Sequence, residues 1–435
     1  MKTFTHKIPR FALALTTLAL SFSATQQLKA ASWLPTGAMN TARGSEPTAT
    51  LLPNGKVLVV GGVAAGVDLH NAEVYDPTTA TWTATGLMPN SVSGGYETAT
   101  LLTNGLVLAA GSAPAVTSTD LYDPATGTWT ATGAMNTSRD GPAAVLLPNG
   151  KVLVMGGYNG SYLDSAELYN PATGTWTTTG AMHAARQHPI PALLPNGKVL
   201  MSGGHQFDSF SEAETYDPAT GTWTTTDSMS VARYGNTMTL LPNGKVLVTG
   251  GGNRSITSVS SAELYDPATG TWAATGSMTT AHNGHTANLL SNGKVLVSGG
   301  YDANGLTVAS AELYDPATGT WTATAAMNTA RSAHAAVLLP SLNKVLVAGG
   351  NDANGTALSS AELYDAGVSL SINMYAGLTI FAPAGSTNQI QYVNNLNNTN
   401  WTTLTNLVLP SNPYIFIDYG SPGQAHRFYR DVLLP

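Results

Sequence analysis

The side chains that could do chemistry in this chain of 435 residues are aromatic rings and histidines in segments that vary along the chain. Aromatic faces stack on a sugar or a peptide segment, while nearby polar groups fix its orientation. We therefore nominate nine candidate ligand-binding residues: His188, Tyr234, His285, His334, Tyr158, His205, Phe207, Arg254 and Tyr301. The alternative is that these are ordinary loop residues, because loops also vary without function.

Three of the histidines raise the question of a metal site. Such a site needs two or three imidazoles that converge. His188, His285 and His334 come from different parts of the chain and could meet only near a common axis. The segment Asp-Ala-Asn-Gly, at residues 302–305 and 352–355, hints at a calcium loop but lacks its remaining ligands, so a polar turn is favoured. We predict no metal and no other cofactor.

Signatures of known enzyme classes are absent from the sequence. It contains no cysteine, and no Gly-x-Ser-x-Gly, Walker or His-Glu-x-x-His pattern occurs. We therefore predict no catalytic residue. The sequence leaves catalysis open but favours a binding protein over an enzyme.

A repeat surrounds the candidate residues and must position them. The stretch AELYDPATGTW at residues 311–321 recurs almost unchanged along the chain, and its tryptophan recurs every 47 to 49 residues. This spacing is typical of one blade of a β-propeller. Residues repeated in every copy do one structural job, so we assign packing roles to Trp33, Trp82, Trp129, Trp176, Trp223, Trp272 and Trp321.

One copy of the repeat reads as four short strands. Residues 142–157 form two apolar strands joined at Pro-Asn-Gly, where glycine tolerates the backbone of a tight hairpin. A third strand follows at 165–169, and a fourth at 175–182 alternates polar and apolar residues. Four antiparallel strands per unit, stacked radially, describe an all-β propeller.

The order of the repeated residues resembles the kelch motif. A typical copy has Gly-Gly, then Tyr, then Trp seven residues later, then Met and, four residues on, usually Arg. The resemblance covers residues 31 to about 367 and implies a propeller like the central domain of galactose oxidase. It also implies that the connections into each blade and the loops after Gly-Gly crowd one face. The copper radical cofactor of galactose oxidase needs a Cys bonded to a Tyr, so the lack of cysteine disfavours that activity.

The first and the last copies of the repeat are each incomplete. Trp33 precedes any Gly-Gly pair, and Tyr364 is not followed by a tryptophan. A segment from Ser32 to Met39 that completes the seventh blade would close the ring and remove two exposed sheet edges. We thus predict a signal peptide at 1–30, a seven-bladed kelch β-propeller at 31–367 and a small C-terminal β-sandwich module at 368–435.

Five arginines occupy the position four residues after the repeated methionine. They could form a ring that binds an anion, or each could pair with the acid in the third strand of its own copy. A guanidinium that reaches such a carboxylate forms an internal ion pair, which we call a tie, and is not free to bind a ligand. We favour the tie for Arg43, Arg139, Arg186, Arg233 and Arg331.

The N-terminal sequence indicates the cellular compartment, and the net charge limits the classes of partner. The first thirty residues have a basic head, an apolar stretch too short to span a bilayer and a small residue at Ala30. Removing them takes away four basic residues and no acid, which moves the formal charge from −7 to −11. This balance excludes nucleic acid as a plausible partner. We expect export to the periplasm, the cell surface or the outside.

The expected function is ligand binding on the loop face of the propeller. The ligand would be an extracellular carbohydrate or protein. The alternative is a sugar-modifying enzyme, such as an epimerase or mutarotase, on the same scaffold. An enzyme would need an acid, a base or a charged clamp from several blades in one pocket.

Overall fold

The structure is a computed structural model that describes residues 30–89, 97–112, 115–253, 255 and 257–367, together with five strands nearer the C-terminus. Every regular element in these residues is a β-strand. Residues Ala30–Gly367 form one compact unit. No helix in the described part of the chain is long and apolar enough to cross a membrane.

Seven four-stranded antiparallel sheets make up this unit, and we number them as blades 1 to 7. The strands of blades 1 to 3 are β2 (Thr48–Leu51), β3 (Val57–Val60), β6 (Ala72–Asp76) and β7 (Thr81–Ala84); β8 (Thr98–Leu101), β9 (Val107–Ala110), β10 (Thr119–Asp123) and β11 (Thr128–Ala131); and β12 (Ala143–Leu146), β13 (Val152–Met155), β14 (Ala166–Asn170) and β15 (Thr175–Thr179). Those of blades 4 to 6 are β16 (Ile190–Leu193), β17 (Val199–Ser202), β18 (Ala213–Asp217) and β19 (Thr222–Thr225); β20 (Thr237–Leu240), β21 (Val246–Thr249), β22 (Ala262–Asp266) and β23 (Thr271–Ala274); and β24 (Thr286–Leu289), β25 (Val295–Ser298), β26 (Ala311–Asp315) and β27 (Thr320–Ala323).

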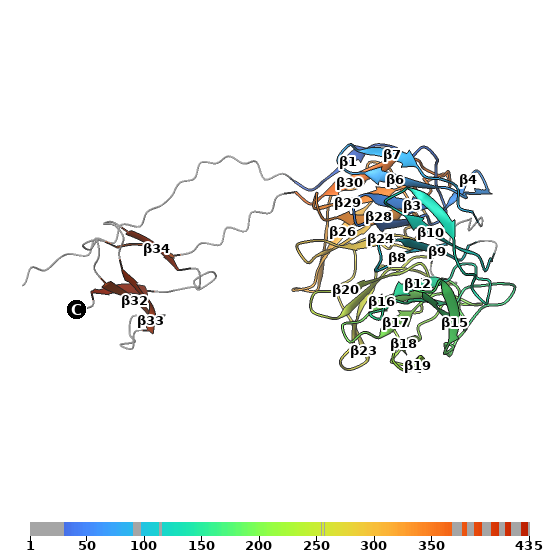
Figure 1. The fold of residues 1–435 in the computed structure, drawn as a ribbon. Coiled ribbons are helices and arrows are strands. Elements are labelled where there is room, and N and C mark those ends of the chain that lie inside the picture. Colours follow the sequence, from blue (N-terminus) through green and yellow to red (C-terminus); the bar gives the residue numbers. More distant parts are fainter. Residues whose placement is uncertain are drawn as a thin grey trace, which may run out of the picture. The chain divides into compact units, whose positions relative to one another are not determined.

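Blade 7 joins the two ends of the propeller. Its strands are β28 (Ala335–Leu339), β29 (Lys344–Ala348), β30 (Ala361–Asp365) and the N-terminal β1 (Ser32–Thr36). In β1, Trp33 lies opposite Tyr364 of β30. Figure 1 shows this closure, with blue β1 beside orange β30. The predictions of seven blades and of closure by the N-terminal strand are both confirmed.

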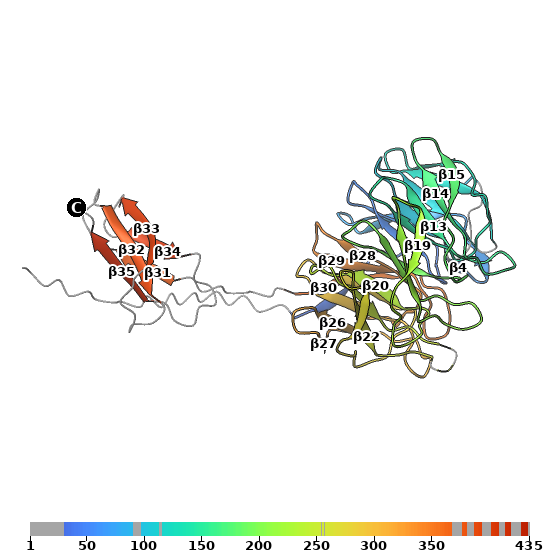
Figure 2. The ribbon, with the colours of Figure 1, turned by 90° about the horizontal axis from the view of Figure 1, so that it is seen from below.

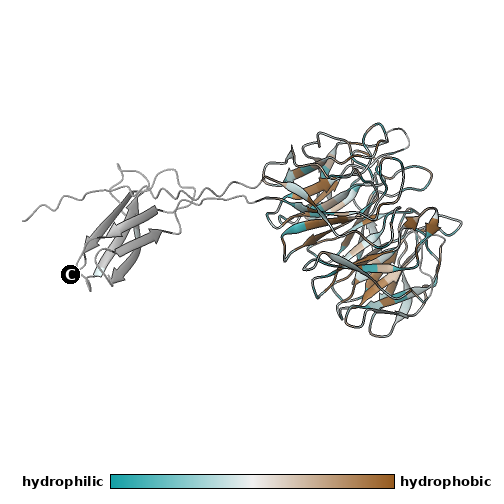
Figure 3. Cartoon of the chain, turned by 90° about the horizontal axis from the view of Figure 1, so that it is seen from above, coloured by the Kyte–Doolittle hydropathy of each residue, from teal (hydrophilic) through white to brown (hydrophobic). Residues whose placement is uncertain are grey.

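The core lies between consecutive blades. The second strand of each blade is buried at nearly every position because both of its faces pack against neighbouring sheets. Figure 3 shows the strands as the most hydrophobic parts of the blades. Each repeated tryptophan packs on the tyrosine of its own blade, as Trp176 does on Tyr169 with ring centroids 5.1 Å apart. Its indole nitrogen reaches the preceding blade, where Trp176 Nε1 donates to Gly133 O at 2.8 Å.

The repeated turn owes its shape to two residues. Asp315 Oδ1 accepts a hydrogen bond from Ala317 N at 2.9 Å, which fixes the start of the turn. Gly319 has φ +69°, a conformation that costs glycine nothing. In blade 1 the same position is Ala80, which is held at φ +56°. The sequence identifies both the turn and this strained exception.

Strand direction divides the turns between two faces of the propeller. In each blade the first hairpin and the Asp-Pro turn lie at one end of the sheet, which we call the hairpin face. The loops after Gly-Gly and the connections into the next blade lie at the other end, which we call the loop face. Figure 2 gives a second view of the blades that carry these turns.

Five described strands lie in the C-terminal segment: β31 (Ala376–Ile380), β32 (Thr387–Val393), β33 (Thr402–Val408), β34 (Tyr414–Asp418) and β35 (Phe428–Leu433). β31 pairs with β34, and β32 lies between β33 and β35. These strands fall on the segments that the sequence analysis singles out. Their packing as a β-sandwich stays a prediction. The proposed signal peptide lies outside the described residues.

Candidate functional site

The loop face brings two sets of segments together in every blade that is described there. The residue after the kelch arginine position forms a backbone bridge with the residue after Gly-Gly. In blade 3, Asp140 N donates to Tyr158 O and Tyr158 N donates to Asp140 O, each at 2.8 Å. In blade 4, Gln187 pairs with His205 in the same way. Variable side chains from both sets are therefore held next to one another, as the kelch resemblance implies.

A group of aromatic side chains from blades 3, 4 and 5 gathers on this face. Tyr162 lies at its centre, with ring centroids 5.2 Å from Tyr158, 5.7 Å from Phe207 and 6.0 Å from His205. The His205 ring also lies 5.9 Å from Tyr234. We define the aromatic cluster by its six members: Tyr158, Tyr162, His188, His205, Phe207 and Tyr234.

Two rings of the aromatic cluster are open to solvent. Phe207 is 73% exposed and Tyr234 is 36% exposed, whereas Tyr158, Tyr162 and His205 are half-buried. The rings meet edge to face at angles between 61° and 76°, an arrangement favoured by their quadrupoles. The half-buried rings thus hold the exposed ones in fixed orientations.

His188 sits in an unusual backbone conformation. Its φ of +51° is rare for a residue with a side chain, and the corresponding residue is glycine in three other blades. Its ring lies 5.4 Å from that of His205 and fills the space above Gly141. Burial, together with the nearby His205, lowers the pKa of His188 to about 4. The imidazole is therefore neutral at pH 7.

The base of the cluster is tied to the core of blade 4. The guanidinium carbon of Arg186 lies 4.2 Å from the centroid of the Phe210 ring, a cation–π contact. The same arginine donates to Glu214 Oε1 at 3.3 Å. Gln187 Nε2 donates to Asp140 O at 3.4 Å across the boundary between two blades.

Two polar atoms in these loops lack a hydrogen-bond partner among the described residues. Asp140 Oδ1 and His205 Nδ1 are buried and have no hydrogen-bond partner among the described residues. Burial raises the pKa of Asp140, and the charge of Asp68 adds to that shift. Burial also lowers the pKa of His205. One of these atoms belongs to a member of the aromatic cluster, His205, and the other to Asp140, whose backbone bridges that of Tyr158.

The two other nominated histidines lie elsewhere. His285 and His334, each 5% exposed, directly precede the first strands of blades 6 and 7. His285 Nε2 lies 2.9 Å from Thr249 Oγ1, and His334 Nε2 lies 3.0 Å from Thr286 Oγ1, so both imidazoles bond to the preceding blade. Burial lowers the pKa of His285 well below its usual value and that of His334 to about 3.

The position held by these two histidines, which we call the seam position, has a packing role. Its side chain lies over the first glycine of the Gly-Gly pair in the preceding blade. A Cβ on Gly250 would lie 2.7 Å from His285 Cε1, and one on Gly299 would lie 2.8 Å from His334 Cε1. The described residues at the seam position are Pro47, Glu97, Pro142, Pro189, Asn236, His285 and His334.

The structure thus places five of the nine nominated residues in the aromatic cluster: Tyr158, His188, His205, Phe207 and Tyr234. Tyr301 lies on the loop face of blade 6, where it bridges Asn283. Arg254 lies outside the described residues. Tyr162 and Asp140 were not nominated. Tyr162 lies four residues after Tyr158 in the same loop. Asp140 directly follows a kelch arginine, as Gln187 and Tyr234 do. These positions in the repeat are the sequence features from which both residues could have been predicted.

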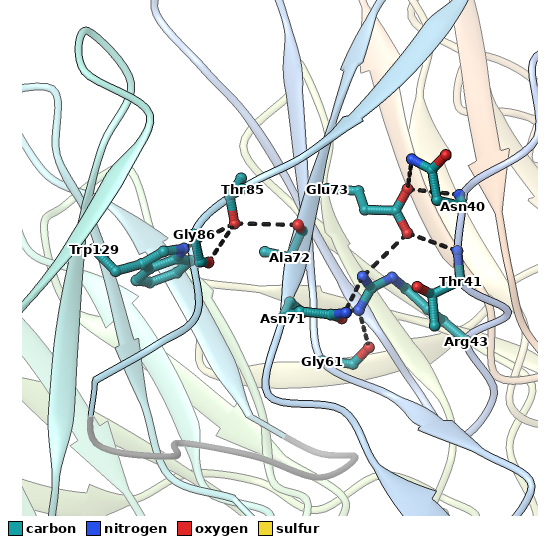
Figure 4. A network of polar contacts seen from close by, with 10 residues as sticks. All are labelled: Asn40, Thr41, Arg43, Gly61, Asn71, Ala72, Glu73, Thr85, Gly86 and Trp129. Carbon is teal, nitrogen blue, oxygen red and sulfur yellow. Dashed lines mark hydrogen bonds and ion pairs between the residues drawn. The ribbon is translucent and has the colours of Figure 1, made fainter.

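The five arginines are internal ties, as predicted, and the alternative of an anion-binding ring is wrong. Arg43 donates to Glu73 Oε1 at 3.2 Å, to Gly61 O at 2.8 Å and to Asn71 Oδ1 at 2.8 Å (Figure 4). All five arginine side chains are fully buried. The ion pairs are Arg43–Glu73, Arg139–Glu167, Arg186–Glu214, Arg233–Glu263 and Arg331–Glu362, at 3.0 to 3.3 Å.

In blade 6 a histidine takes the place of the arginine. His282 Nδ1 lies 2.7 Å from Gly299 O, and His282 Nε2 lies 3.6 Å from Glu312 Oε1. The shorter side chain leaves Ser310 Oγ buried without a hydrogen-bond partner. The equivalent Ser360 accepts a hydrogen bond from Arg331 Nη2 at 3.1 Å in blade 7. Among the described residues, no group of three or more His, Asp or Glu side chains is placed to hold a metal ion.

Comparison with known proteins agrees with this geometry. Residues 165–375 match the family model described as Attractin/LZTR1 beta-propeller, and residues 47–85 and 141–183 match the kelch motif. The chain is therefore a seven-bladed β-propeller built from kelch motifs. None of the curated proteins matches the chain.

Two solved structures share the fold. One is described as "Novel fungal alcohol oxidase with catalytic diversity among the AA5 family, in complex with copper"; it is 19% identical, with 92% of each chain covered and a TM-score of 0.64. The other, "Structure of YjhT", is 17% identical and covers 62% of this chain and 94% of its own, with a TM-score of 0.50. At these identities the similarity shows the fold alone.

Proposed function

We propose that this protein is an exported binding module whose loop face holds a carbohydrate or protein ligand against the aromatic cluster. The observation that carries the proposal is that Phe207, 73% exposed, and Tyr234 are oriented by rings beneath them. Apolar ring surface left in water is a common feature of binding sites. Because the rings are already held, a ligand would lose little free energy in ordering them.

The polar atoms around the rings support the same proposal. Asp140 Oδ1 and His205 Nδ1 would gain a hydrogen bond from a ligand, because neither has one from the described residues. A ligand hydroxyl or amide fits both groups. Stacking would supply affinity, and these hydrogen bonds would fix the orientation of the ligand.

Two of the nominated histidines and the described arginines are already engaged elsewhere, which weakens the alternative of a sugar-modifying enzyme. His285 and His334 bond to threonines in the seam between blades. The five described kelch arginines are each paired with a glutamate. We therefore put forward binding rather than catalysis.

The experiment that tests the proposal is a glycan array and a peptide array, each probed with the mature chain. Phe207→Ala and Tyr234→Ala should weaken any specific signal because they remove exposed stacking surface. Leu87→Ala is the matched control: Leu87 is also 73% exposed but lies outside the aromatic cluster. A specific ligand that binds all three variants as tightly as the unmodified chain would refute the role of the cluster.

Export is tested by N-terminal sequencing of the protein recovered from its host. We expect the mature chain to begin at Ala31, directly after the small residue at the proposed cleavage point. Recovery of the chain with Met1 intact from the cytoplasm would overturn this part of the proposal.

A further inference from the structure

The two faces of the propeller differ in charge. On the hairpin face, the first hairpins carry six lysines and the ends of the third strands carry six aspartates, so the formal charges cancel. On the loop face, the loops after Gly-Gly and the connections into the blades carry ten acids, Arg254 and the five kelch arginines, which are paired with glutamates of the third strands. The ten acids are Glu46, Asp68, Glu97, Asp140, Asp164, Asp208, Glu212, Asp227, Asp302 and Asp352.

Five of the six lysines of the hairpin face are already paired. Lys198 Nζ lies 3.1 Å from Asp217 Oδ2, and Lys294 Nζ lies 3.0 Å from Asp315 Oδ2. The same pairing occurs in blades 1, 5 and 7. The described kelch arginines are buried in their own ion pairs. Neither the lysines nor these arginines therefore neutralise the acids of the loop face.

The charge of Asp68 in blade 1 acts on acids of the next two blades. Glu97 is only 3% exposed, and neither of its carboxylate oxygens has a hydrogen-bond partner among the described residues. Burial raises its pKa well above the usual value; Arg43 opposes the shift and Asp68 adds to it. Asp68 also raises the pKa of Asp140, which bridges Tyr158 in the aromatic cluster. Asp68 and Asp140 are half-buried, whereas Glu97 is enclosed at the seam position over Gly61.

Aromatic rings beside carboxylates suit a particular ligand chemistry. The face of a Tyr or Phe ring attracts an ammonium or guanidinium group, and a carboxylate pairs with the same group. Phe207 and Tyr234 provide exposed rings, and Asp140 provides an oxygen without a partner. A neutral sugar would use the rings but would gain nothing from the excess of negative charge.

We propose that the loop face binds a basic polypeptide segment, with lysine or arginine side chains placed against the aromatic cluster and the carboxylates of Asp68 and Asp140. This inference rests on the proposed function and narrows its ligand to a cationic protein partner. The complementary charges also steer the partner toward the loop face as it approaches.

The test measures binding of three probes to the mature chain by calorimetry: a nonalysine peptide, a nonaglutamate peptide and the neutral sugar maltoheptaose. We expect the lysine peptide alone to bind. Its affinity should fall as salt is raised, because the screening length shrinks from about 10 Å at 0.1 M to about 3 Å at 1 M. The double variant Asp68→Asn and Asp140→Asn should weaken it about tenfold, roughly the effect of losing two partly screened charge contacts.

The matched control removes the same charge from the hairpin face, with Asp217→Asn and Asp266→Asn. Asparagine is native at this turn position in blade 3, as Asn170, so the fold should tolerate both changes. Equal weakening by the two double variants would overturn the inference, since the peptide would then sense only net charge. Failure of the lysine peptide to bind would also overturn it.

The outcomes separate this inference from the proposed function. If maltoheptaose binds, loses affinity in Phe207→Ala and is unaffected by Asp68→Asn and Asp140→Asn, the cationic partner is refuted and the aromatic binding site stands. If the lysine peptide binds and Phe207→Ala has no effect, the aromatic cluster is refuted as the site. Thermal unfolding of each variant checks that it is folded.

Discussion

Arg43 and Glu73 form an ion pair of 3.2 Å in which the arginine side chain is 0% exposed and the glutamate 1%. The arginine comes from the connection into blade 1, and the glutamate from its third strand. The pair therefore fastens the loop face to the sheet beneath it. Equivalent pairs recur in blades 3, 4, 5 and 7.

Breaking one of these pairs should be costly. In Glu167→Gln, Arg139 keeps its charge in a buried site but loses the opposing carboxylate, so we expect a loss of about 3 kcal/mol or more in the free energy of unfolding. Urea unfolding measures this loss. Asp217→Asn, which removes a partly exposed pair with Lys198, should cost less than about 1 kcal/mol. Similar losses in the two variants would contradict the prediction.

Restoring the arginine in blade 6 should stabilise the protein. In His282→Arg, the guanidinium would reach both Glu312 and the unpartnered Ser310 Oγ, as Arg331 reaches Glu362 and Ser360. We expect a gain of about 1.5 to 3 kcal/mol, the scale of hydrogen bonds to a charged group. Thermal unfolding measures it, with Arg331→His as the reverse substitution. A lower midpoint for His282→Arg would show that blade 6 has adapted to the smaller ring.

The buried histidine at the seam position of blade 7 should make stability depend on pH. The pKa of His334 is lowered to about 3 in the folded protein, against about 6.5 when unfolded. The folded state then binds fewer protons, so the stabilising contribution of neutral His334 is present above pH 6.5 and is lost as the pH falls toward 3.

The substitution that tests this is His334→Asn, because asparagine is native at the seam position of blade 5. The variant should lose less stability than the unmodified chain between pH 7 and pH 4. The difference in slope should approach about 1.4 kcal/mol per pH unit. Parallel curves of unfolding free energy against pH for the two proteins would argue against a neutral buried His334.

The first glycine of each Gly-Gly pair should not accept a side chain. Gly250 has φ +58°, and a Cβ there would collide with His282 O as well as with the His285 ring. We expect Gly250→Ala to lower the free energy of unfolding by more than about 3 kcal/mol, combining strain with overpacking. Gly127→Ala should cost only about 1 to 2 kcal/mol, because the site is open and Ala80 is native at the same turn position. Chemical unfolding of both variants measures the contrast, and equal costs would rule out the steric explanation.

The architecture follows from sequence because local chemistry repeats. Asp315, Pro316 and Gly319 specify a turn by their own backbone preferences, and the constant spacing of the tryptophans gives the blade count. The unmatched Trp33 and Tyr364 reveal how the ring closes. The pairing of the kelch arginines follows as well, since an acid recurs at one position of every copy.

The candidate site depends on the tertiary structure. The sequence groups His188, His285 and His334 as residues beside the arginine position, but His188 stands one residue earlier relative to the first strand of its blade. That offset places His188 at a positive φ beside His205, whereas His285 and His334 point into the seam over glycine.

The sequence by itself determined the repeat, the strands, the turns and the closure, because each depends on residues close in the chain or on a pattern repeated along it. Only the tertiary structure decided which variable side chains meet. Tyr158, His205 and Tyr234 lie in different blades, and their contacts exist because bridged loops hold them on one face. His188 lies one residue earlier before its strand than the histidines at the seam position do, and its side chain points in a different direction. Only the packing of neighbouring blades determines that difference.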